Sequence, residues 1–431
     1  MERMLQYVWK HKLYADSDLM TTGGEPVFVI DPGTTNIDAG PDFFNAKIRI
    51  GDIVWVGNVE IHERASDWFA HHHDKDKSYN SVVLHIVRKD NTSVCRTDNE
   101  VIPQIVFCVP KKVEENIEWL LSRDTPVTCA GRICLVSPLH LSDWMSALLM
   151  ERFERKTHDI FTRLEKNSKD WSEAFYITLM RNFGFSTNSD AFELLAGSLP
   201  YKCILKHRNN PLQVEALFFG QAGLLSNEQF TMHNAQLISS DKYLQSLRRE
   251  YDFISKKYNL QPVEAFLFKS LRTRPINFPH VRLAQIAAVW INNDLLFSKV
   301  LEARCAEDLR ALFNVEPSEY WRTHYNFRSA STNIRKKAIG KNASDIILIN
   351  TVIPVLFAYG KNKNLPEYCE RALRLLEEIK PEKNSIVSVF CNAGISVKNA
   401  GDTQALIQLR REYCDKKKCL YCRIGYRLIG N

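Results

Sequence analysis

The sequence predicts an α+β module at the N-terminus, a mixed sheet flanked by helices, followed by a large and mainly α-helical region. Short β-branched segments bounded by turn residues dominate the first quarter of the chain. Beyond them, Phe, Leu and Ala recur at helical spacings of three and four. With about 150 residues per domain, the 431 residues suffice for two or three domains. We place the parts at residues 1–112, 113–400 and 401–431.

The N-terminal module is expected to contain a β-hairpin at its centre. Gly51-Asp52 is a turn dipeptide between two alternating segments, 43–50 and 53–62. Residues 81–87 read SVVLHIV, an apolar run typical of a buried strand. The expected order is helix 4–13, strand 26–30, hairpin 43–62, a helix from residue 67, and strands 81–87 and 102–109.

The remainder of the chain is expected to be helical, because its apolar residues fall on one face of a 3.6-residue period. Prolines at 200, 211, 275 and 279 separate the segments. The expected helices are 113–122, 138–165, 170–183, 189–196, 211–223, 241–257, 279–295, 297–313, 344–359, 365–378, 384–394 and 400–412.

The composition is that of an ordinary globular protein, with 45% hydrophobic and 25% charged residues. No apolar run reaches the roughly 20 residues of a membrane span, and the N-terminus lacks the apolar core of a signal peptide. We therefore expect a cytoplasmic protein with no membrane partner.

The charge is distributed unevenly along the chain. Residues 1–110 carry 11 Lys and Arg against 16 Asp and Glu, a net charge of −5, and the remainder carries +12 of the chain's total of +7. An acidic part joined to a basic part suits a metal site beside a surface that binds a polyanion. Ordinary surface charge explains the same numbers.

The residues with the clearest chemistry surround the expected hairpin. Side chains alternate along a strand, so Glu60 and His62 are expected on the same side. The partner strand brings Asp42 close to Glu60. Carboxylates of this kind suit Mg²⁺ or Mn²⁺, and an imidazole can join them. A turn role for Asp42 and an exposed salt bridge for Glu60 are the alternatives.

This pattern, Pro41-Asp42 followed by Glu60-Ile61-His62 on the hairpin, resembles the PD-(D/E)XK nuclease superfamily. The resemblance implies a restriction-endonuclease-like sheet, with Asp42, Glu60 and the Ile61 carbonyl binding a divalent metal. His62 stands where the superfamily has a catalytic Lys, and Lys47 on the preceding strand is the candidate to supply that charge.

The function implied is metal-dependent hydrolysis of phosphodiester bonds in DNA or RNA. Asp42 and Glu60 would hold the metal, while His62 would orient or deprotonate the water. A catalytically inactive nucleic-acid-binding or scaffold protein is the alternative. A hydrolase acting on another phosphate- or carbonyl-containing small molecule at Glu60, His62 and His73 is a third reading.

The chain as a whole also resembles an uncharacterised bacterial family known as a domain of unknown function. The resemblance rests on segments such as GPDFFNAKIRI, VEIHERASDW, FFGQAGLL and RTRPINFPHVRLAQ. It implies a shared fold and carries no established activity.

Histidines are concentrated directly after the hairpin. Three of them, His71 to His73, precede acidic residues and could bind a soft divalent ion. His85 lies within an apolar strand. We expect His73 and His85 to support the metal site or to contact phosphate. A buried structural role for His85 and a loop position for His71 and His73 are the alternatives.

Two segments of the helical region have the composition of a nucleic-acid surface, in which basic residues contact phosphates and aromatic residues stack on bases. An ordinary solvated face with aromatic residues in the core is the alternative. The candidate nucleic-acid contacts are Arg272, Arg274, Arg282, Arg335, Lys336 and Lys337.

Three cysteines near the C-terminus, Cys414, Cys419 and Cys422, follow a Cys-x4-Cys-x2-Cys spacing. In a reducing compartment such a cluster favours a metal over disulfides. A zinc ion or an iron–sulfur cluster uses four ligands, and the candidates for the fourth are Cys129, Cys134 and Cys391. Three packed thiols at a helix end are the alternative.

Overall fold

The computed structural model describes residues 2–14, 19–36, 38–122, 125–226, 241–271, 273–328 and 330–430. The chain forms two compact units. Unit 1 comprises Met1–Trp144, Asn392–Ile395 and Leu409–Asn431, and unit 2 comprises Met145–Cys391 and Ser396–Gln408. The predicted boundaries do not coincide with this division, because the C-terminal residues pack with the first 144 residues.

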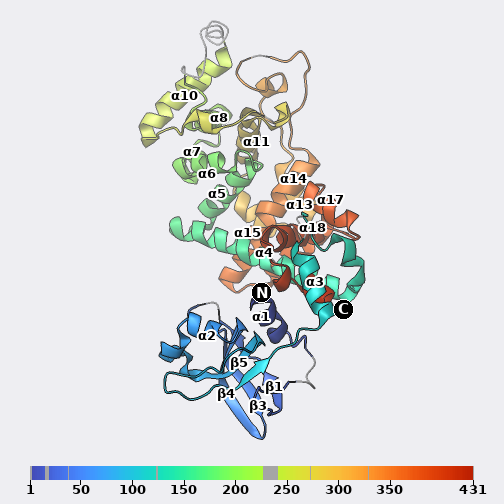
Figure 1. Cartoon of the computed structure of the whole chain (residues 1–431). Coiled ribbons are helices and arrows are strands. Elements are labelled where there is room, and N and C mark those ends of the chain that lie inside the picture. Colours follow the sequence, from blue (N-terminus) through green and yellow to red (C-terminus); the bar gives the residue numbers. More distant parts are fainter. Residues whose placement is uncertain are drawn as a thin grey trace. The chain divides into compact units, whose positions relative to one another are not determined.

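Unit 1 is built on a six-stranded mixed sheet (Figure 1) with the order β1-β3-β4-β5-β6, and β2 also pairs with β3. β1, β3 and β4 are antiparallel, whereas β4, β5 and β6 are parallel. The predicted mixed sheet is thus confirmed. Its strands are β1 (Val27–Asp31), β2 (Thr34–Thr35), β3 (Phe43–Ile50), β4 (Ile53–Arg64), β5 (Val82–Lys89) and β6 (Gln104–Val106).

The register of the central hairpin separates a core face from a polar face. Phe43 pairs with Val59, and both are fully buried. A bulge follows, since three steps along β3 from Phe43 to Ala46 match two steps along β4 from Val59 to Gly57. Alternation then directs Glu60 to the opposite face from Val59.

Short helices and turns complete unit 1. Helix α2 is part of the connection between the parallel strands β4 and β5, as a parallel crossover requires. The C-terminal helix α19 packs against α3. These elements are α1 (Glu2–Lys10), α2 (Asp67–Ala70), α3 (Lys111–Ser122) and α19 (Arg423–Gly430), the 3₁₀ turns η2 (His73–Lys75), η3 (Lys77–Ser81), η4 (Ala130–Leu135) and η11 (Cys419–Tyr421), and the π-helical turn η10 (Leu409–Cys414).

Unit 2 is helical, as predicted, and a continuous apolar core runs through it. Helix α4 (Pro138–Lys166) contains the boundary between the units. The other helices are α5 (Trp171–Phe183), α6 (Ser189–Ser198), α7 (Tyr201–His207), α8 (Pro211–Gln221), α10 (Lys242–Tyr258), α11 (Pro279–Asn292), α12 (Leu296–Glu302), α13 (Ala306–Phe313), α14 (Lys341–Ile347), the π-helical turn η9 (Leu348–Val352), α15 (Ile353–Lys363), α16 (Pro366–Glu378), α17 (Ser385–Asn392) and α18 (Ala400–Gln408). Short 3₁₀ turns are η6 (Ala265–Leu267), η7 (Pro275–Asn277) and η8 (Glu319–Arg322).

One predicted helix, over residues 297–313, is instead two. The Asp308 carboxylate accepts hydrogen bonds from the backbone N–H groups of Arg304 and Cys305, at 3.0 and 3.2 Å. These bonds satisfy donors at a new helix N-terminus, so α12 ends and α13 begins there. Helices α7 and α19 are short and were not predicted.

The segment Lys341–Lys363 is long and apolar enough to cross a membrane by length and composition. In its most apolar 18-residue window, 72% of the residues are buried inside the protein. Such burial is typical of a core helix, and this segment contributes Leu348, Ile353 and Leu356 to the core of unit 2.

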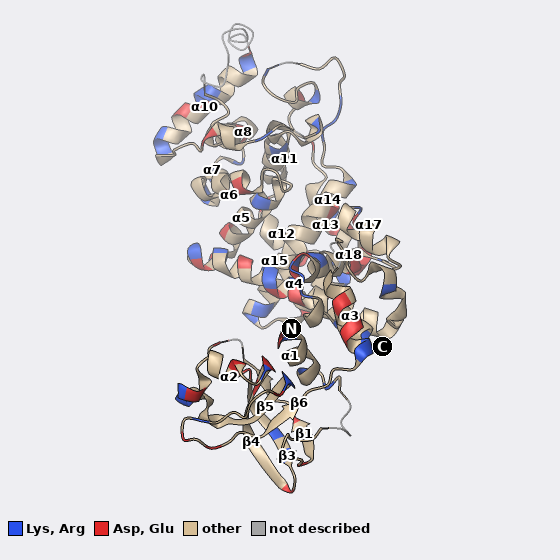
Figure 2. Cartoon of the chain, in the orientation of Figure 1, with Lys and Arg blue, Asp and Glu red and all other residues tan. Residues whose placement is uncertain are grey.

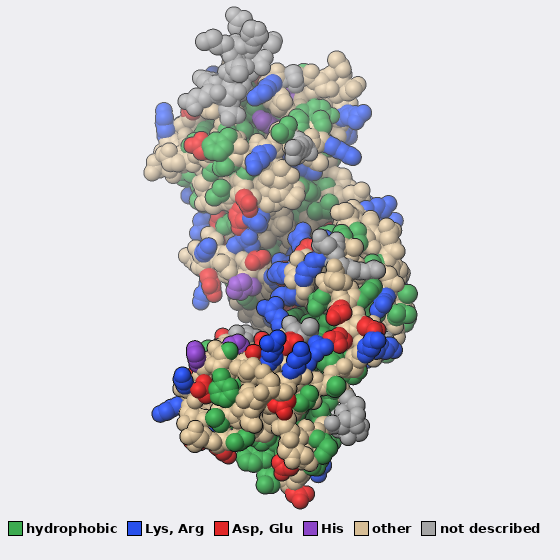
Figure 3. All heavy atoms as spheres, viewed as in Figure 1, with side chains coloured by type: hydrophobic (Ala, Val, Ile, Leu, Met, Phe, Trp, Pro, Cys, Tyr) green, Lys and Arg blue, Asp and Glu red, His purple; other side chains and the backbone are tan. Residues whose placement is uncertain are grey.

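The charged residues of unit 2 are mixed in sign. Lys and Arg occur together with Asp and Glu along α4 and α10 (Figure 2). In the space-filling view, basic side chains are scattered among acidic and hydrophobic ones (Figure 3). The net positive charge of the sequence therefore does not form one continuous patch on this face.

Candidate metal centre

Asp42 and Glu60 meet across strands β3 and β4. The Asp42 backbone N–H donates to Glu60 Oε2 at 2.9 Å, and the Ile61 N–H donates to Asp42 Oδ2 at 3.1 Å. The Gln6 side-chain amide, from α1, donates to Asp42 Oδ1 at 2.8 Å. Both acids are therefore fixed by hydrogen bonds, and Glu60 is only 5% exposed.

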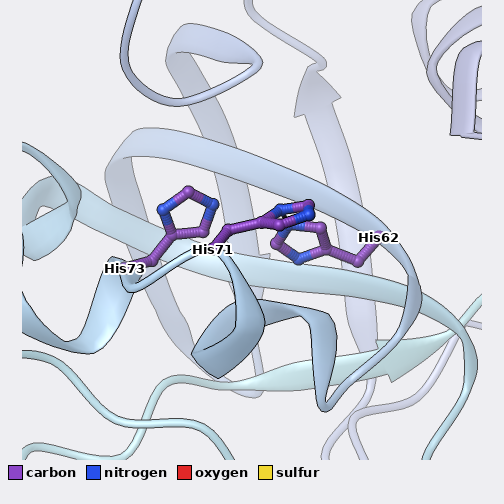
Figure 4. A group of neighbouring side chains, drawn as sticks. All are labelled: His62, His71 and His73. Atoms are coloured by element: carbon purple, nitrogen blue, oxygen red, sulfur yellow. Dashed lines mark hydrogen bonds between the residues drawn. The ribbon is translucent and has the colours of Figure 1, made fainter.

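Three histidines converge on Glu60. His62 follows it on the same face of β4, and its Nε2 lies 3.5 Å from Glu60 Oε1. His73, in η2, places Nε2 3.4 Å from the same oxygen, and His71, at the end of α2, places Nδ1 3.2 Å from His62 Nε2. Figure 4 shows the three rings turned toward one another. Their ligand atoms all lie within 4.8 Å of one another.

The backbone conformation and the ring packing around His71 and His73 hold these side chains in place. His72 adopts a left-handed conformation, with φ of 60°. His73 stacks on Tyr79 with a centroid distance of 3.7 Å. The ring centroid of the fully buried Trp68 lies 5.3 Å from those of His73 and His85, in edge-on contacts. The rings are thus held by packing.

A buried chain of hydrogen bonds fixes which nitrogen of His62 is free. Gln104 Nε2 donates to Asp90 Oδ1 at 2.8 Å, so Gln104 Oε1 accepts from His85 Nδ1, also at 2.8 Å. The neutral His85 then accepts at Nε2 from His62 Nδ1, 2.9 Å away. His62 Nε2 is left with its lone pair directed at Glu60 and His71, as in histidines that bind metals.

Electrostatics at the centre favour a bound cation. Burial raises the pKa of both Asp42 and Glu60 to about 7, and for Asp42 the neighbouring Glu60 adds to the effect. Burial lowers the pKa of His62 to about 2 and that of His85 to about 4, so both rings are neutral. Among the described residues, neither acid has a Lys or Arg ion-pair partner.

Several contacts in this group have the length expected between ligands of one tetrahedral metal ion. Ligands bound at 2.0–2.1 Å around one ion lie about 3.4 Å from one another. Three contacts have this length: His62 Nε2 to His71 Nδ1 at 3.2 Å, and Glu60 Oε1 to His73 Nε2 and His62 Nε2 at 3.4 and 3.5 Å. Three imidazoles and one carboxylate suit a transition metal better than Mg²⁺.

Comparison with known proteins identifies the family. Residues 2–385 match the family model described as "Protein of unknown function (DUF2851)". The chain belongs to the DUF2851 family. No curated protein matches it, and no solved structure does.

In this DUF2851 protein, a cavity of about 710 Å³ lies next to the candidate metal centre within unit 1. It reaches Gln6, whose amide holds Asp42. Arg3, Lys10 and Lys417 line it, together with the acidic Glu118. A second cavity of about 400 Å³ shares Lys10 and adds basic side chains from the C-terminal segment, Arg423 and Arg427.

The structure does not bring Lys47 to the acids. Lys47 is exposed and pairs with Val56, four residues before Glu60 on β4. Four strand residues span about 13 Å. The Lys47 ammonium therefore has no contact with Asp42 or Glu60, and no Lys takes its place among the described neighbours of these acids.

The basic residues predicted to contact nucleic acid have different surroundings. Arg282 is buried, donates to Gln285 and Asn277, and lies 3.9 Å from the Phe185 ring centroid. Lys337 is 1% exposed and donates to the backbone carbonyls of Trp321 and Arg322. This corrects the prediction for these two residues, which are structural. Arg274, Arg335 and Lys336 are exposed, and Arg272 lies outside the described residues.

The three C-terminal cysteines lie together in another part of unit 1, where Cys129 joins them around a small cavity. Cys134 is exposed and does not line this cavity. Cys391 belongs to unit 2 and is exposed.

Sequence reasoning underestimated several residues of the centre. His71 belonged to the histidine run that could bind a divalent ion, but it was not singled out as a site residue, unlike His73 and His85. Gln6, Asp90 and Gln104 carried no signal, because nothing in the local pattern shows that they approach Asp42 or His85. Only the packing of α1 and the pairing of β5 with β6 bring them there.

Proposed function

We propose that unit 1 is a restriction-endonuclease-like, metal-dependent nuclease that hydrolyses phosphodiester bonds in DNA or RNA. The observation that carries the proposal is the convergence of Asp42, Glu60 and His62 from paired strands beside a cavity with basic side chains. Histidines 71 and 73 complete the centre.

The element order supports the proposal. A helix, an antiparallel hairpin with Asp42 and Glu60, a short helix and a parallel strand follow one another as the resemblance to PD-(D/E)XK nucleases implies. The chain differs from the PD-(D/E)XK pattern at His62, which stands at the position of the usual Lys and is neutral rather than cationic. Its free Nε2 makes it a metal ligand in this proposal.

The residues have distinct roles. Glu60, His62, His71 and His73 hold a divalent transition metal such as Mn²⁺ or Zn²⁺. Such an ion polarises a phosphate and lowers the pKa of bound water. Asp42 fixes Glu60 through its backbone N–H and adds a second negative charge to the centre. Asp90 and Gln104 keep His62 in the required tautomer through His85.

The basic residues of the adjoining cavity supply the attraction for the substrate. Arg3 and Lys10 project from α1, the helix whose Gln6 contacts Asp42. Cationic side chains in this position attract phosphates and orient a polyanion toward the acids.

The test is a nuclease assay on single- and double-stranded DNA and RNA with Mg²⁺, Mn²⁺ or Zn²⁺. Glu60→Gln keeps the shape of the side chain and its bond from the Asp42 N–H but removes the charge. We expect metal-dependent cleavage that falls by more than about 100-fold in Glu60→Gln and in His62→Asn, since loss of a direct ligand exceeds the 10–100-fold cost of losing a supporting residue.

His72→Asn is the matched control, because His72 is exposed and Asn tolerates its left-handed backbone. It should cleave as the wild type does. Salt-sensitive binding without cleavage under any metal condition would favour the inactive nucleic-acid-binding alternative. Cleavage that persists in Glu60→Gln would contradict the proposal.

A further inference from the structure

Four cysteines from two segments far apart in the sequence line one small cavity in unit 1. Cys129 precedes η4, whereas Cys414, Cys419 and Cys422 lie 285 or more residues later in and around η10 and η11. All four line a cavity of about 20 Å³, with Thr128, Leu120 and Leu409 among its other walls.

The backbone around Cys419 and Cys422 is a tight turn that presents both sulfurs. The Cys422 N–H donates to the Cys419 carbonyl at 3.2 Å. A Cβ on Gly425 would lie only 2.1 Å from that same carbonyl oxygen, so the chain can return past Cys419 only with glycine there. Pairs of cysteines two residues apart commonly supply two ligands to one metal.

Hydrogen-bond donors surround the Cys422 sulfur. The backbone N–H groups of Ile424 and Gly425 point to it. The neighbouring Trp144 is 3% exposed, and its indole Nε1–H has no hydrogen-bond partner among the described residues. A thiolate at Cys422 would satisfy these donors better than a neutral thiol, because charged acceptors form the stronger hydrogen bonds.

We propose that Cys129, Cys414, Cys419 and Cys422 together bind a thiophilic metal, a centre separate from the histidine site. A set of four thiolates is the ligand set of structural zinc and of iron–sulfur clusters. A cavity of about 20 Å³ has room for one ion-sized particle, which favours a single zinc ion. Such an ion joins the C-terminal segment to residues 113–144 and stabilises this part of unit 1.

The test uses the full-length protein, purified under reducing and anaerobic conditions. Metal content by plasma mass spectrometry should show zinc that survives dialysis, and titration with an organomercurial should release it as the thiols are modified. Replacement by Co²⁺ should give thiolate-to-metal charge-transfer absorption, a signal that the histidine site does not produce.

Cys129→Ser and Cys422→Ser should both lose the charge-transfer band and the tightly held metal. Cys134→Ser is the matched control, since that thiol is exposed and lies five residues from Cys129 outside the cavity. Iron and sulfide held by the same four cysteines would also support the centre and identify a cluster as its occupant. A wild-type protein without thiol-bound metal, or one whose metal remains in Cys129→Ser, would overturn the proposal.

The organomercurial titration needs no variant, so it decides the question even where a serine variant does not fold. Release of metal in step with thiol modification supports the proposal, and release that is independent of thiol modification contradicts it.

Discussion

His62 Nδ1 lies 2.9 Å from His85 Nε2, deep inside unit 1, where His85 is fully buried. This contact connects the proposed metal centre to Gln104 on β6 and, through Gln104, to Asp90, which directly follows β5. The His85 ring therefore determines the orientation and tautomer of His62, which faces Glu60.

The first prediction concerns this chain of hydrogen bonds. Gln104→Met keeps the side-chain length but removes the acceptor for His85 Nδ1, so His62 is no longer held in one tautomer. We expect the affinity for Mn²⁺ or Zn²⁺ at the histidine site to fall by about 10–100-fold, measured by calorimetric titration of Cys129→Ser protein to isolate that site.

Gln285→Met is the control for this variant. Gln285 is a buried glutamine in unit 2 whose amide donates to the Lys337 carbonyl. Its loss should destabilise the protein comparably and leave metal affinity unchanged. An equal loss of affinity in both variants would show that the effect is general destabilisation.

The second prediction concerns pH in the metal-free protein. Burial raises the pKa of Asp42 and Glu60 to about 7, from roughly 3.9 and 4.3 in an unfolded chain. The folded protein then holds protons that the unfolded chain releases between about pH 4 and 7. The stabilisation from these groups is therefore complete below about pH 4 and is lost as the pH rises through 7.

Urea unfolding in a chelator at pH 5 to 8 measures this effect. Asp42→Asn should lose less free energy of unfolding over this range than the wild type, because one of the two acids no longer titrates. Asp52→Asn, in the exposed turn of the hairpin, should follow the wild type. If the free energy of unfolding of the wild type fell with pH no more steeply than that of Asp42→Asn, the burial of the acid pair would be contradicted.

The third prediction concerns the basic residues of α1. The double variant Arg3→Ala/Lys10→Ala removes two exposed cations from the cavity beside Gln6. We expect weaker binding to DNA or RNA. For a duplex, the slope of the logarithm of the binding constant against the logarithm of the salt concentration should be smaller in magnitude by roughly 1.8, since each phosphate contact contributes about 0.9. Fluorescence anisotropy across a salt series measures it.

Arg49→Ala/Lys89→Ala removes the same charge from exposed positions on β3 and β5 and should leave the slope unchanged. Lys337→Met should likewise preserve the slope but reduce the free energy of unfolding, because its buried ammonium donates to two backbone carbonyls. If Lys337→Met reduced the salt dependence of binding and left the free energy of unfolding unchanged, Lys337 would be a nucleic-acid contact and not a structural residue.

The fourth prediction concerns Gly425. Alanine at this position would place its Cβ against the Cys419 carbonyl, so the turn has to open. We expect a loss of about 1–3 kcal/mol in the free energy of unfolding, together with loss of the proposed thiolate-bound metal. Gly131→Ala, near Cys129 but with open space around the added Cβ, should change neither.

Local sequence patterns determined most of the secondary structure. Period-two alternation and the Gly51-Asp52 turn were enough to predict the hairpin of β3 and β4, and with it the approach of Asp42 to Glu60. Helical periodicity predicted most of unit 2. These features depend on residues that are neighbours in the sequence, so they can be recognised without the fold. Helical periodicity did not predict the break between α12 and α13, where the Asp308 side chain caps a new helix.

The tertiary structure alone decided which residues complete each site. His85, Gln104 and Asp90 form a chain of hydrogen bonds because β5 lies between β4 and β6 in parallel register. Cys129 joins Cys422 because the C-terminal segment returns to unit 1. The burial of Arg282 and Lys337 likewise depends on distant packing. Composition gives the charge of a residue, but only the folded chain decides whether that charge meets solvent, a carbonyl or a ligand.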